Sequence, residues 1–162
     1  MSASESPFNF HDHFQNSDFF RSIFETAIDG VIIINKLGVI LLLNPSAAAL
    51  FGFQEEELVG KNVNMLMPEP HSGQHHQYIK NHLETGEKKI IGIGREVLGL
   101  RKDGNLFPLR LAVSRFTIGE DIYFTGIIHD LSAQKEAEKN LWFLNKNLEK
   151  WLSPGPASCR KA

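Results

Sequence analysis

Cysteine and long apolar runs are both scarce in this sequence. The single cysteine, Cys159, lies among the last residues of the 162-residue chain, so no internal disulfide and no cysteine-based metal cluster can form. The longest apolar runs are about five residues, against the roughly 20 needed to span a bilayer. The polar N-terminus lacks the apolar core of a signal peptide. We therefore expect a soluble, cytoplasmic protein.

Charge of one sign and catalytic signatures are also scarce. The chain has 17 Lys and Arg against 19 Asp and Glu, a formal net charge of -2, so it offers no basic excess for nucleic acid or an anionic membrane. It contains no HExxH and no G-x-S-x-G, and GIGREVLG does not fit G-x-G-x-x-G. We therefore expect no catalytic residues. The length suits one domain with tails.

The apolar residues that are present change their period along the chain. Residues 18–27 follow Ser17, a suitable N-cap, and their apolar stripe at helical spacing predicts a short helix. The β-rich runs at 30–35 and 39–44 are joined by KLG, whose glycine suits a tight turn. These runs predict the first two strands.

The middle of the chain predicts several short helices. Asn44 can cap one of them, Pro45 is tolerated at its first position and Gly52 can end it. QEEELVG repeats this pattern on a smaller scale, and the prolines of MLMPEP then prevent a continuous helix. The histidine-rich run that comes next predicts a helix over residues 72–83.

Three further strands are predicted at residues 90–101, 106–116 and 123–131. Asp103 and Gly104 indicate a tight hairpin with positive φ at both central positions. Alternation places two sets of side chains each on one side of its strand. They are Phe107, Leu109, Leu111 and Val113 on one strand, and Ile122, Phe124, Gly126 and Ile128 on the next. Such sets line a pocket or fill a plain core, and the pattern does not choose between the two.

The last predicted element is an amphipathic helix over residues 132–151. Its apolar residues recur at the spacings of the a/d seam of a coiled coil. They are Ala137, Leu141, Leu144, Leu148 and Trp151. The whole order indicates an α+β fold, with a five-stranded antiparallel sheet, short helices over one face, and a helix at each end. A pocket between helices and sheet is expected.

Histidines gather in the predicted helix over 72–83 and just before it. His71, His75 and His82 fall near one helical face, so periodicity does not choose among them as ligands, and His76 points elsewhere. Each is equally consistent with a solvated or capping role. A zinc or iron site made by the three is geometrically possible, although no carboxylate is set among them.

Several of these segments resemble a PAS domain. The general features are FETAIDGVIIIN, GVILLLNPSAAALFGF, EEELVGKNVNMLMP, RKDGNLFPLRL and HDLSAQKEAE, which cover residues 20–139. A narrower set, NVNMLMPEP, HHQYI, IIGIGREV and YFTGIIHDL, is similar to the haem-binding oxygen-sensor PAS domains of the FixL type. The resemblance implies a flexible arm over 1–17, a PAS sensor domain over 18–131, a signalling and dimerisation helix over 132–151 and a disordered tail over 152–162.

The same resemblance implies roles for particular residues around haem b. His75 takes the place of the proximal iron ligand, Tyr78 lies one turn further on, and Arg95 takes the place of the distal arginine that approaches bound oxygen. The other implied positions are Asn81 and Lys89 near the propionates, Ile90, Leu111 and Val113 in the apolar distal wall, and Phe124 and Gly126 on the last strand. Asn81 and Lys89 replace the arginine and histidine expected near the propionates.

Arg95 has a second interpretation from the sequence alone. A cation after the apolar run IIGIG is costly to bury without a polar partner, which favours a ligand beside it. The alternative is a surface arginine paired with Glu96 or Asp103. Arg95 and Ile90 have opposite parity, so both reach one pocket only if an intervening glycine bends the strand.

The resemblance implies haem-based sensing of dioxygen, or of carbon monoxide or nitric oxide, relayed through the final helix to an output domain outside this sequence. The parent is then expected to be a histidine kinase of a two-component system or a cyclic-nucleotide enzyme, and the chain a homodimer through its N- and C-terminal helices. The alternative is a PAS dimerisation or connector module with no haem or with another small ligand. A flavin photosensor is not favoured, because it needs a cysteine in the helical segment.

Overall fold

The structure is a computed structural model that describes residues 9, 12, 17–69, 73–74, 77, 79–80 and 94–152. The chain divides into two compact units, Met1–Asp130 and Leu131–Ala162. The first unit holds the sheet and the short helices, and the second holds a single long helix. Each unit is described by itself.

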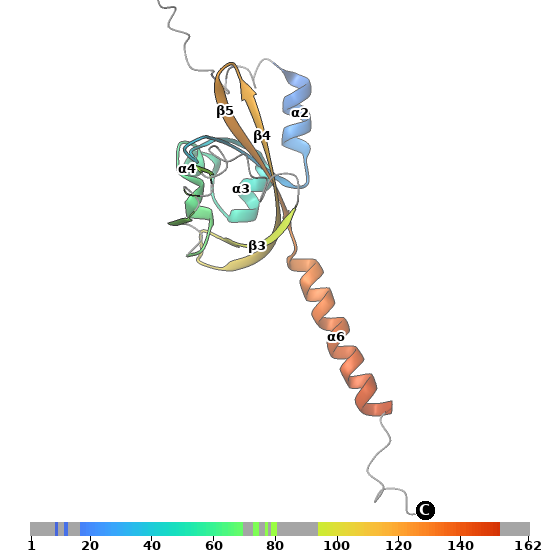
Figure 1. The fold of residues 1–162 in the computed structure, drawn as a ribbon. Helices are drawn as coiled ribbons and strands as arrows, with labels where there is room; N and C mark the ends of the chain where they lie inside the picture. Colours follow the sequence, from blue (N-terminus) through green and yellow to red (C-terminus); the bar gives the residue numbers. More distant parts are fainter. Residues whose placement is uncertain are drawn as a thin grey trace, which may run out of the picture. The chain divides into compact units, whose positions relative to one another are not determined.

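The sheet of the first unit has five strands, all paired antiparallel, in the order β2-β1-β5-β4-β3 (Figure 1). The strands are β1 (Gly30–Asn35), β2 (Ile40–Leu43), β3 (Arg95–Leu100), β4 (Leu106–Ile118) and β5 (Asp121–Asp130). The first and last strands in sequence, β1 and β5, are therefore neighbours at the centre of the sheet. The predicted five-stranded antiparallel sheet is confirmed.

Short helices follow β2, as the capping residues predict. Helix α3 (Pro45–Phe51) begins after Asn44, whose side chain accepts a hydrogen bond from the Ala47 amide, and ends at Gly52 with a left-handed φ of 75°. Only glycine adopts that conformation without strain. Helix α4 (Glu55–Leu58) and the 3-10 helix η1 (Val63–Leu66) come next. Figure 1 shows α3 and α4 on one side of the sheet.

Helix α2 (Asp18–Thr26) lies on the other side of the sheet in Figure 1. The side chain of Ser17 caps it by accepting a hydrogen bond from the Phe20 amide at 3.4 Å. Of its predicted apolar stripe, only Phe24 is buried, against Ile33 and Leu42. This helix therefore covers one part of the sheet and leaves other apolar side chains at the surface.

The two faces of the sheet carry separate apolar clusters. We call the side that bears Ile32 and Ile34 the inner face, and the side that bears Val31 and Ile33 the outer face. The inner cluster is larger and combines sheet residues with α3, α4 and η1. It includes Ile32, Ile34, Ala47, Phe51, Leu58, Leu66, Ile79, Phe107, Leu109, Phe124 and Ile128. The outer cluster is Phe24, Ile33 and Leu42. The strand β1 thus supplies alternate residues to both.

One sequence expectation, on the turn at Asp103 and Gly104, is wrong, and another lies partly outside the described residues. The predicted positive φ at both Asp103 and Gly104 is wrong, because only Gly104 has one, at 87°. Instead, the Asp103 carboxylate accepts a hydrogen bond from the Asn105 amide at 2.9 Å. This side-chain hydrogen bond stabilises the turn in place of a backbone hydrogen bond. Parts of the predicted helix over 72–83 and residues 90–93 of the predicted third strand lie outside the described residues.

The second unit is helix α6 (Ser132–Leu152), 21 residues long and without a buried residue. The predicted seam is present as an exposed apolar stripe, in which Leu141, Leu144 and Leu148 are each more than half exposed. Within the described part of the chain, no helix combines the length and the apolar character needed to cross a bilayer.

Candidate functional site

The inner face of β3, β4 and β5 gathers the predicted site residues that the structure describes. Arg95 pairs with Leu111 across β3 and β4, and Val113 pairs with Gly126 across β4 and β5. Directly paired residues of antiparallel strands point to the same face, as do residues two apart on one strand. Phe124, two residues from Gly126, belongs to the same face. The structure therefore brings Arg95, Leu111, Val113, Phe124 and Gly126 together on one surface.

Burial changes across this surface. Phe124 is only 4% exposed and belongs to the inner cluster. Leu111 and Val113 are half-buried, and Arg95 is exposed at the start of β3. Arg95 is thus the exposed, polar end of a face whose other end, at Phe124, is closed by packing. A ligand with an apolar body and one polar end would match that gradient.

Gly126 leaves room on this surface. A Cβ built on Gly126 would lie 3.5 Å from Leu111 Cδ1 and 3.9 Å from the Ile32 carbonyl oxygen, which are ordinary contacts among the described atoms. On the same face, a Cβ on Gly99 would lie 2.6 Å from Leu109 Cδ2 and 2.7 Å from Phe107 Cε1. Among the described atoms, a methyl group therefore fits at Gly126 and does not fit at Gly99.

Arg95 is exposed, as the surface alternative expects, but neither of the two expected pairings is found among the described residues. Glu96 is on the outer face, where its carboxylate lies 3.9 Å from Nη2 of Arg110. Asp103 is engaged with Asn105. Among the residues that the structure describes, no hydrogen bond or ion pair involves the Arg95 side chain. Its guanidinium, always charged and rich in donors, thus has no described partner, and the residue belongs to the inner face.

Half of the predicted site lies outside the described residues. This holds for His75, Tyr78, Asn81, Lys89 and Ile90, and also for the other histidines of that segment. Their roles stay predictions. Within the described residues, no group of three His, Cys, Asp or Glu side chains could hold a metal ion.

A long-range ion pair that sequence reasoning missed joins the end of β3 to the end of β5. Nη2 of Arg101, the residue after β3, lies 3.4 Å from Oδ2 of Asp130, the last residue of β5. The same guanidinium stacks 4.2 Å from the ring centroid of Phe107. Arg101 and Asp130 are 29 residues apart in sequence, so no local pattern indicates the contact. It links the strand that begins at Arg95 to the strand that leads into α6.

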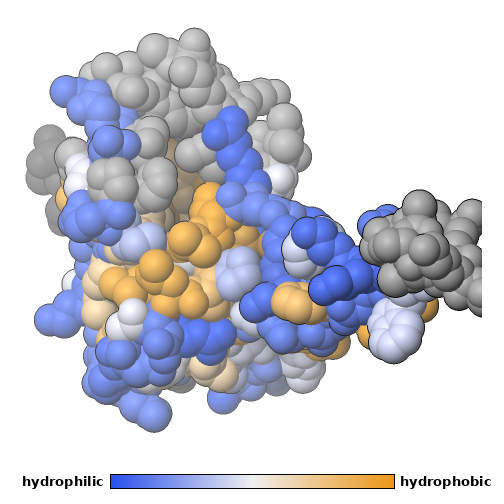
Figure 2. Space-filling model, turned by 90° about the horizontal axis from the view of Figure 1, so that it is seen from below, coloured by the Kyte–Doolittle hydropathy of each residue, from blue (hydrophilic) through white to orange (hydrophobic). Residues whose placement is uncertain are grey.

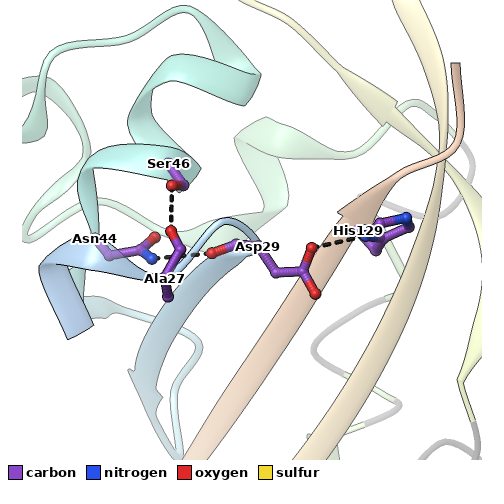
Figure 3. Close-up of polar contacts among 5 residues, drawn as sticks. All are labelled: Ala27, Asp29, Asn44, Ser46 and His129. Atoms are coloured by element: carbon purple, nitrogen blue, oxygen red, sulfur yellow. Dashed lines mark hydrogen bonds and ion pairs between the residues drawn. The ribbon is translucent and has the colours of Figure 1, made fainter. Parts of the chain in front are cut away.

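A polar network fixes the loop between α2 and β1 (Figure 3). Buried Asn44 donates from Nδ2 to the Asp29 carbonyl at 2.9 Å and accepts at Oδ1 from the Val31 amide at 2.8 Å. Ser46 donates to the Ala27 carbonyl at 2.6 Å. The Asp29 carboxylate in turn lies 2.6 Å from Nδ1 of His129 on β5. The capping residue that starts α3 therefore also positions the start of β1.

Apolar surface extends beyond the candidate site along β3, an edge strand of the sheet. Figure 2 views the molecule from below, the side toward which β3 lies in Figure 1, and shows apolar atoms gathered there. On β3 and the start of β4, Val97, Leu98 and Leu106 are 38%, 49% and 51% exposed. Of these three residues, Val97 shares the inner face with the candidate site, whereas Leu98 and Leu106 lie on the outer face.

Comparison with known proteins agrees with this architecture. Residues 18–131 match the family described as PAS fold. The sensor protein FixL of Bradyrhizobium diazoefficiens is 41% identical over 128 residues, which cover 79% of this chain and 25% of that protein. The oxygen sensor protein DosP of Escherichia coli K12 is 31% identical over 133 residues, 80% of this chain and 16% of that protein. The chain thus spans a quarter or less of the length of these relatives.

Solved structures show the same fold at low sequence identity. The PAS domain of an HTR-like protein from Haloarcula marismortui has a TM-score of 0.58 at 19% identity, covering 74% of this chain and 95% of that one. A LOV protein of Rhodobacter sphaeroides has a TM-score of 0.57 at 18% identity, covering 75% of this chain and 69% of that one. With the sheet order, the flanking short helices and the family match over 18–131, these findings show that the chain belongs to the PAS family.

Proposed function

We propose that the first unit is a haem-based gas sensor that binds haem b against the inner face of β3, β4 and β5, with dioxygen as its ligand and carbon monoxide or nitric oxide as competing ligands. The observation that carries the proposal is the placement of Arg95 on one face with Leu111, Val113 and the small residue Gly126. The likeness to FixL and to DosP, which is named as an oxygen sensor, supports it.

The described half of the site suits haem. A porphyrin needs an apolar slot, and half-buried Leu111 and Val113, with the small residue Gly126 beside them, would form one wall of it. His75 would supply the axial nitrogen. In the predicted helix it precedes Ile79 by four residues, the spacing that puts two side chains on one helical face, and Ile79 is buried in the inner cluster. Asn81, Lys89, Tyr78 and Ile90 would complete the rim and wall.

Haem, when bound, would supply the iron to which a diatomic gas attaches. The chain's own contribution to gas binding is Arg95. Its guanidinium carries a permanent positive charge and several hydrogen-bond donors, and the residue lies at the exposed end of the apolar face. A hydrogen bond from a charged donor to a polar ligand contributes about 1.5–3 kcal/mol, which corresponds to roughly 10- to 150-fold in affinity.

Strand β3 is the part of the fold that can report a change at Arg95. It begins at Arg95 and ends at Leu100, and the next residue, Arg101, pairs with Asp130, which lies two positions before the start of α6. If β3 shifts when Arg95 gains or loses a partner, the Arg101–Asp130 ion pair would shift with it. Coupling requires that the ligand contact the two states differently, and Arg95 provides that difference.

The exposed apolar stripe of α6 supports a dimeric output. Most helices in proteins gain their stability from packing an amphipathic face against a partner, and the a/d residues of α6 are exposed in the single chain. Pairing with the same helix of a second copy would bury them. We propose a homodimer through the N- and C-terminal helices, which passes the signal to an output domain such as a histidine kinase.

The test is absorption spectroscopy of protein prepared with ample haem, reduced, and then exposed to air. A Soret band that shifts on adding oxygen or carbon monoxide supports the proposal, and colourless protein after haem addition supports the connector alternative. His75→Ala should lose haem, whereas the neighbouring His76→Ala should keep it. If His75→Ala retains an unaltered haem spectrum, the axial assignment is wrong.

A second pair of variants tests Arg95 separately. Arg95→Ala should keep haem but bind oxygen at least about tenfold more weakly, because it loses a charged donor. Arg110→Ala is the matched control, since it removes an arginine from the outer face of the neighbouring strand. Equal oxygen affinities of the two variants would show that Arg95 does not contact the ligand.

A further inference from the structure

The contact between Asp29 and His129 joins the two ends of the sensor unit. Asp29 lies in the loop between α2 and β1, and His129 is the second-last residue of β5, 100 residues later. Their side chains meet at 2.6 Å between Oδ1 and Nδ1, with the carboxylate accepting (Figure 3). The loop is held on its other side by α3, through Asn44 and Ser46.

The same contact ends a row of charges that crosses the outer face. Glu96 on β3 is paired with Arg110 on β4, and Arg110 is the direct cross-strand neighbour of His129 on β5. Directly opposed residues share a face, so Glu96, Arg110, His129 and Asp29 follow one another across three strands to the loop. This row lies on the opposite side of the sheet from Arg95 and the candidate ligand site.

The last two residues of β5 thus face opposite ways and have different partners. Asp130 is paired with Arg101, next to Phe107 of the inner cluster. His129 is paired with Asp29 on the outer side. The helix α6 begins two residues after Asp130. The segment that leads into α6 therefore has one contact to each face of the sheet.

We propose that His129 is a positioning residue that couples the N-terminal helix α2 to the first turn of α6 along the outer face, independently of any ligand on the inner face. A displacement of α2 moves the loop that holds Asp29, and the contact with His129 carries it to the end of β5. The side chains of His129 and Asp29 are 53% and 42% exposed. Exposed pairs of this kind contribute little to stability. Its effect is therefore one of position rather than of stability.

The experiment is amide hydrogen exchange on the whole chain, read at Lys135. The amide of Lys135 donates to the Leu131 carbonyl at 2.8 Å and closes the first turn of α6. Asp29→Ala and His129→Ala should each raise its exchange rate by about threefold or more, since local opening sets that rate. The double variant should exchange no faster than the faster single variant, because the two changes remove one contact.

A perturbation of α2 separates coupling from simple loosening. Phe24→Leu keeps an apolar side chain but disturbs the packing of α2 on Ile33 and Leu42. It should alter exchange at Lys135 in the wild-type background and have no effect there once His129→Ala is present. In an Arg101→Ala background, the matched control from the inner face, the effect of Phe24→Leu should persist.

Two results would overturn the proposal. One is unchanged exchange at Lys135 in folded His129→Ala protein. The other is an effect of Phe24→Leu that is as large with His129→Ala as without it. Because all measurements are made without haem, either result leaves the gas-sensing proposal standing, and a colourless protein leaves this one standing.

Discussion

Two glycines on the inner face allow a sharp test of where the sheet has room. The same change, glycine to alanine, is made at Gly126 and at Gly99, neither of which has a positive φ. At Gly126 the new methyl group meets Leu111 Cδ1 at 3.5 Å, an ordinary contact. At Gly99 it would lie 2.6 Å from Leu109 Cδ2 and 2.7 Å from Phe107 Cε1. The two variants should therefore differ in the sign of their effect on stability.

The magnitudes follow from these distances. Gly126→Ala removes conformational freedom from the unfolded chain and should raise the free energy of unfolding by about 0.5–1 kcal/mol. Gly99→Ala gains the same term but forces two buried side chains to move, an overpacking that costs about 1–3 kcal/mol. Since 1 kcal/mol shifts the melting temperature of a domain of this size by about 3–6 °C, circular dichroism melts resolve the two.

A ligand measurement completes this test. Under the proposed function, the Gly126→Ala methyl group points into the space that haem would use, so haem uptake should weaken although the protein melts higher. Gly99→Ala should bind haem in proportion to its folded fraction. If Gly126→Ala melts as low as Gly99→Ala, a methyl group does not fit at Gly126 and the surface is plain core.

Three further predictions concern the scaffold. Asn44→Ala should lower the free energy of unfolding by about 2–4 kcal/mol in urea titrations, because it removes a helix cap and leaves the part-buried Val31 amide unpaired; an effect under about 0.5 kcal/mol would refute this. Gly30→Ala should also destabilise, since its Cβ would lie 3.1 Å from Ala47 Cα and push α3 off β1, and a melting temperature equal to wild type would contradict that close approach. Burial raises the pKa of the Tyr123 phenol, with the charge of Asp121 adding to it, so the folded state holds that proton more tightly than the unfolded chain. The stability gained is complete below the unfolded pKa of about 10 and is lost as pH rises through the folded pKa. The urea midpoint of the wild type should therefore fall between about pH 8 and 11, and that of Tyr123→Phe should fall less.

Local chemistry made much of the scaffold predictable. Asn44, Pro45 and Gly52 act within one short helix, and each takes the position that its own backbone preference favours. The alternation in β4 and β5 likewise placed Leu111 and Gly126 on one face with their strand neighbours. These features depend on residues only a few positions apart, which is the range over which a sequence pattern predicts structure.

The site needed information that the pattern does not hold. Alternation assigns Leu109 and Leu111 to one face but cannot tell that the first is buried and the second half-buried, because that depends on which helix lies above each. The pairs Arg101–Asp130 and Asp29–His129 span 29 and 100 residues. They arise only when the strand order sets β5 between β1 and β4.

The turn after β3 shows a different limit. Asp103 and Gly104 correctly indicated a reversal of the chain, yet the expected φ at Asp103 was wrong. A carboxylate that can accept from the Asn105 amide offers the backbone a second way to turn. Aspartate at such a position therefore predicts that a turn occurs better than it predicts the type of turn.

Three isoleucines in succession, Ile32 to Ile34, let β1 serve both clusters, and this has a consequence for how the strand finds its alignment. If β1 slipped by one residue against its neighbours, isoleucine would still face each side of the sheet. Hydrophobic packing alone therefore does not distinguish the native register from the shifted one. The ends of the strand must do so: Gly30, which alone allows Ala47 so close, and Asn35, whose Oδ1 accepts from the Leu37 and Val39 amides at 2.9 and 3.0 Å. Substitutions at these two ends should therefore misalign the strand more readily than any exchange among its apolar residues.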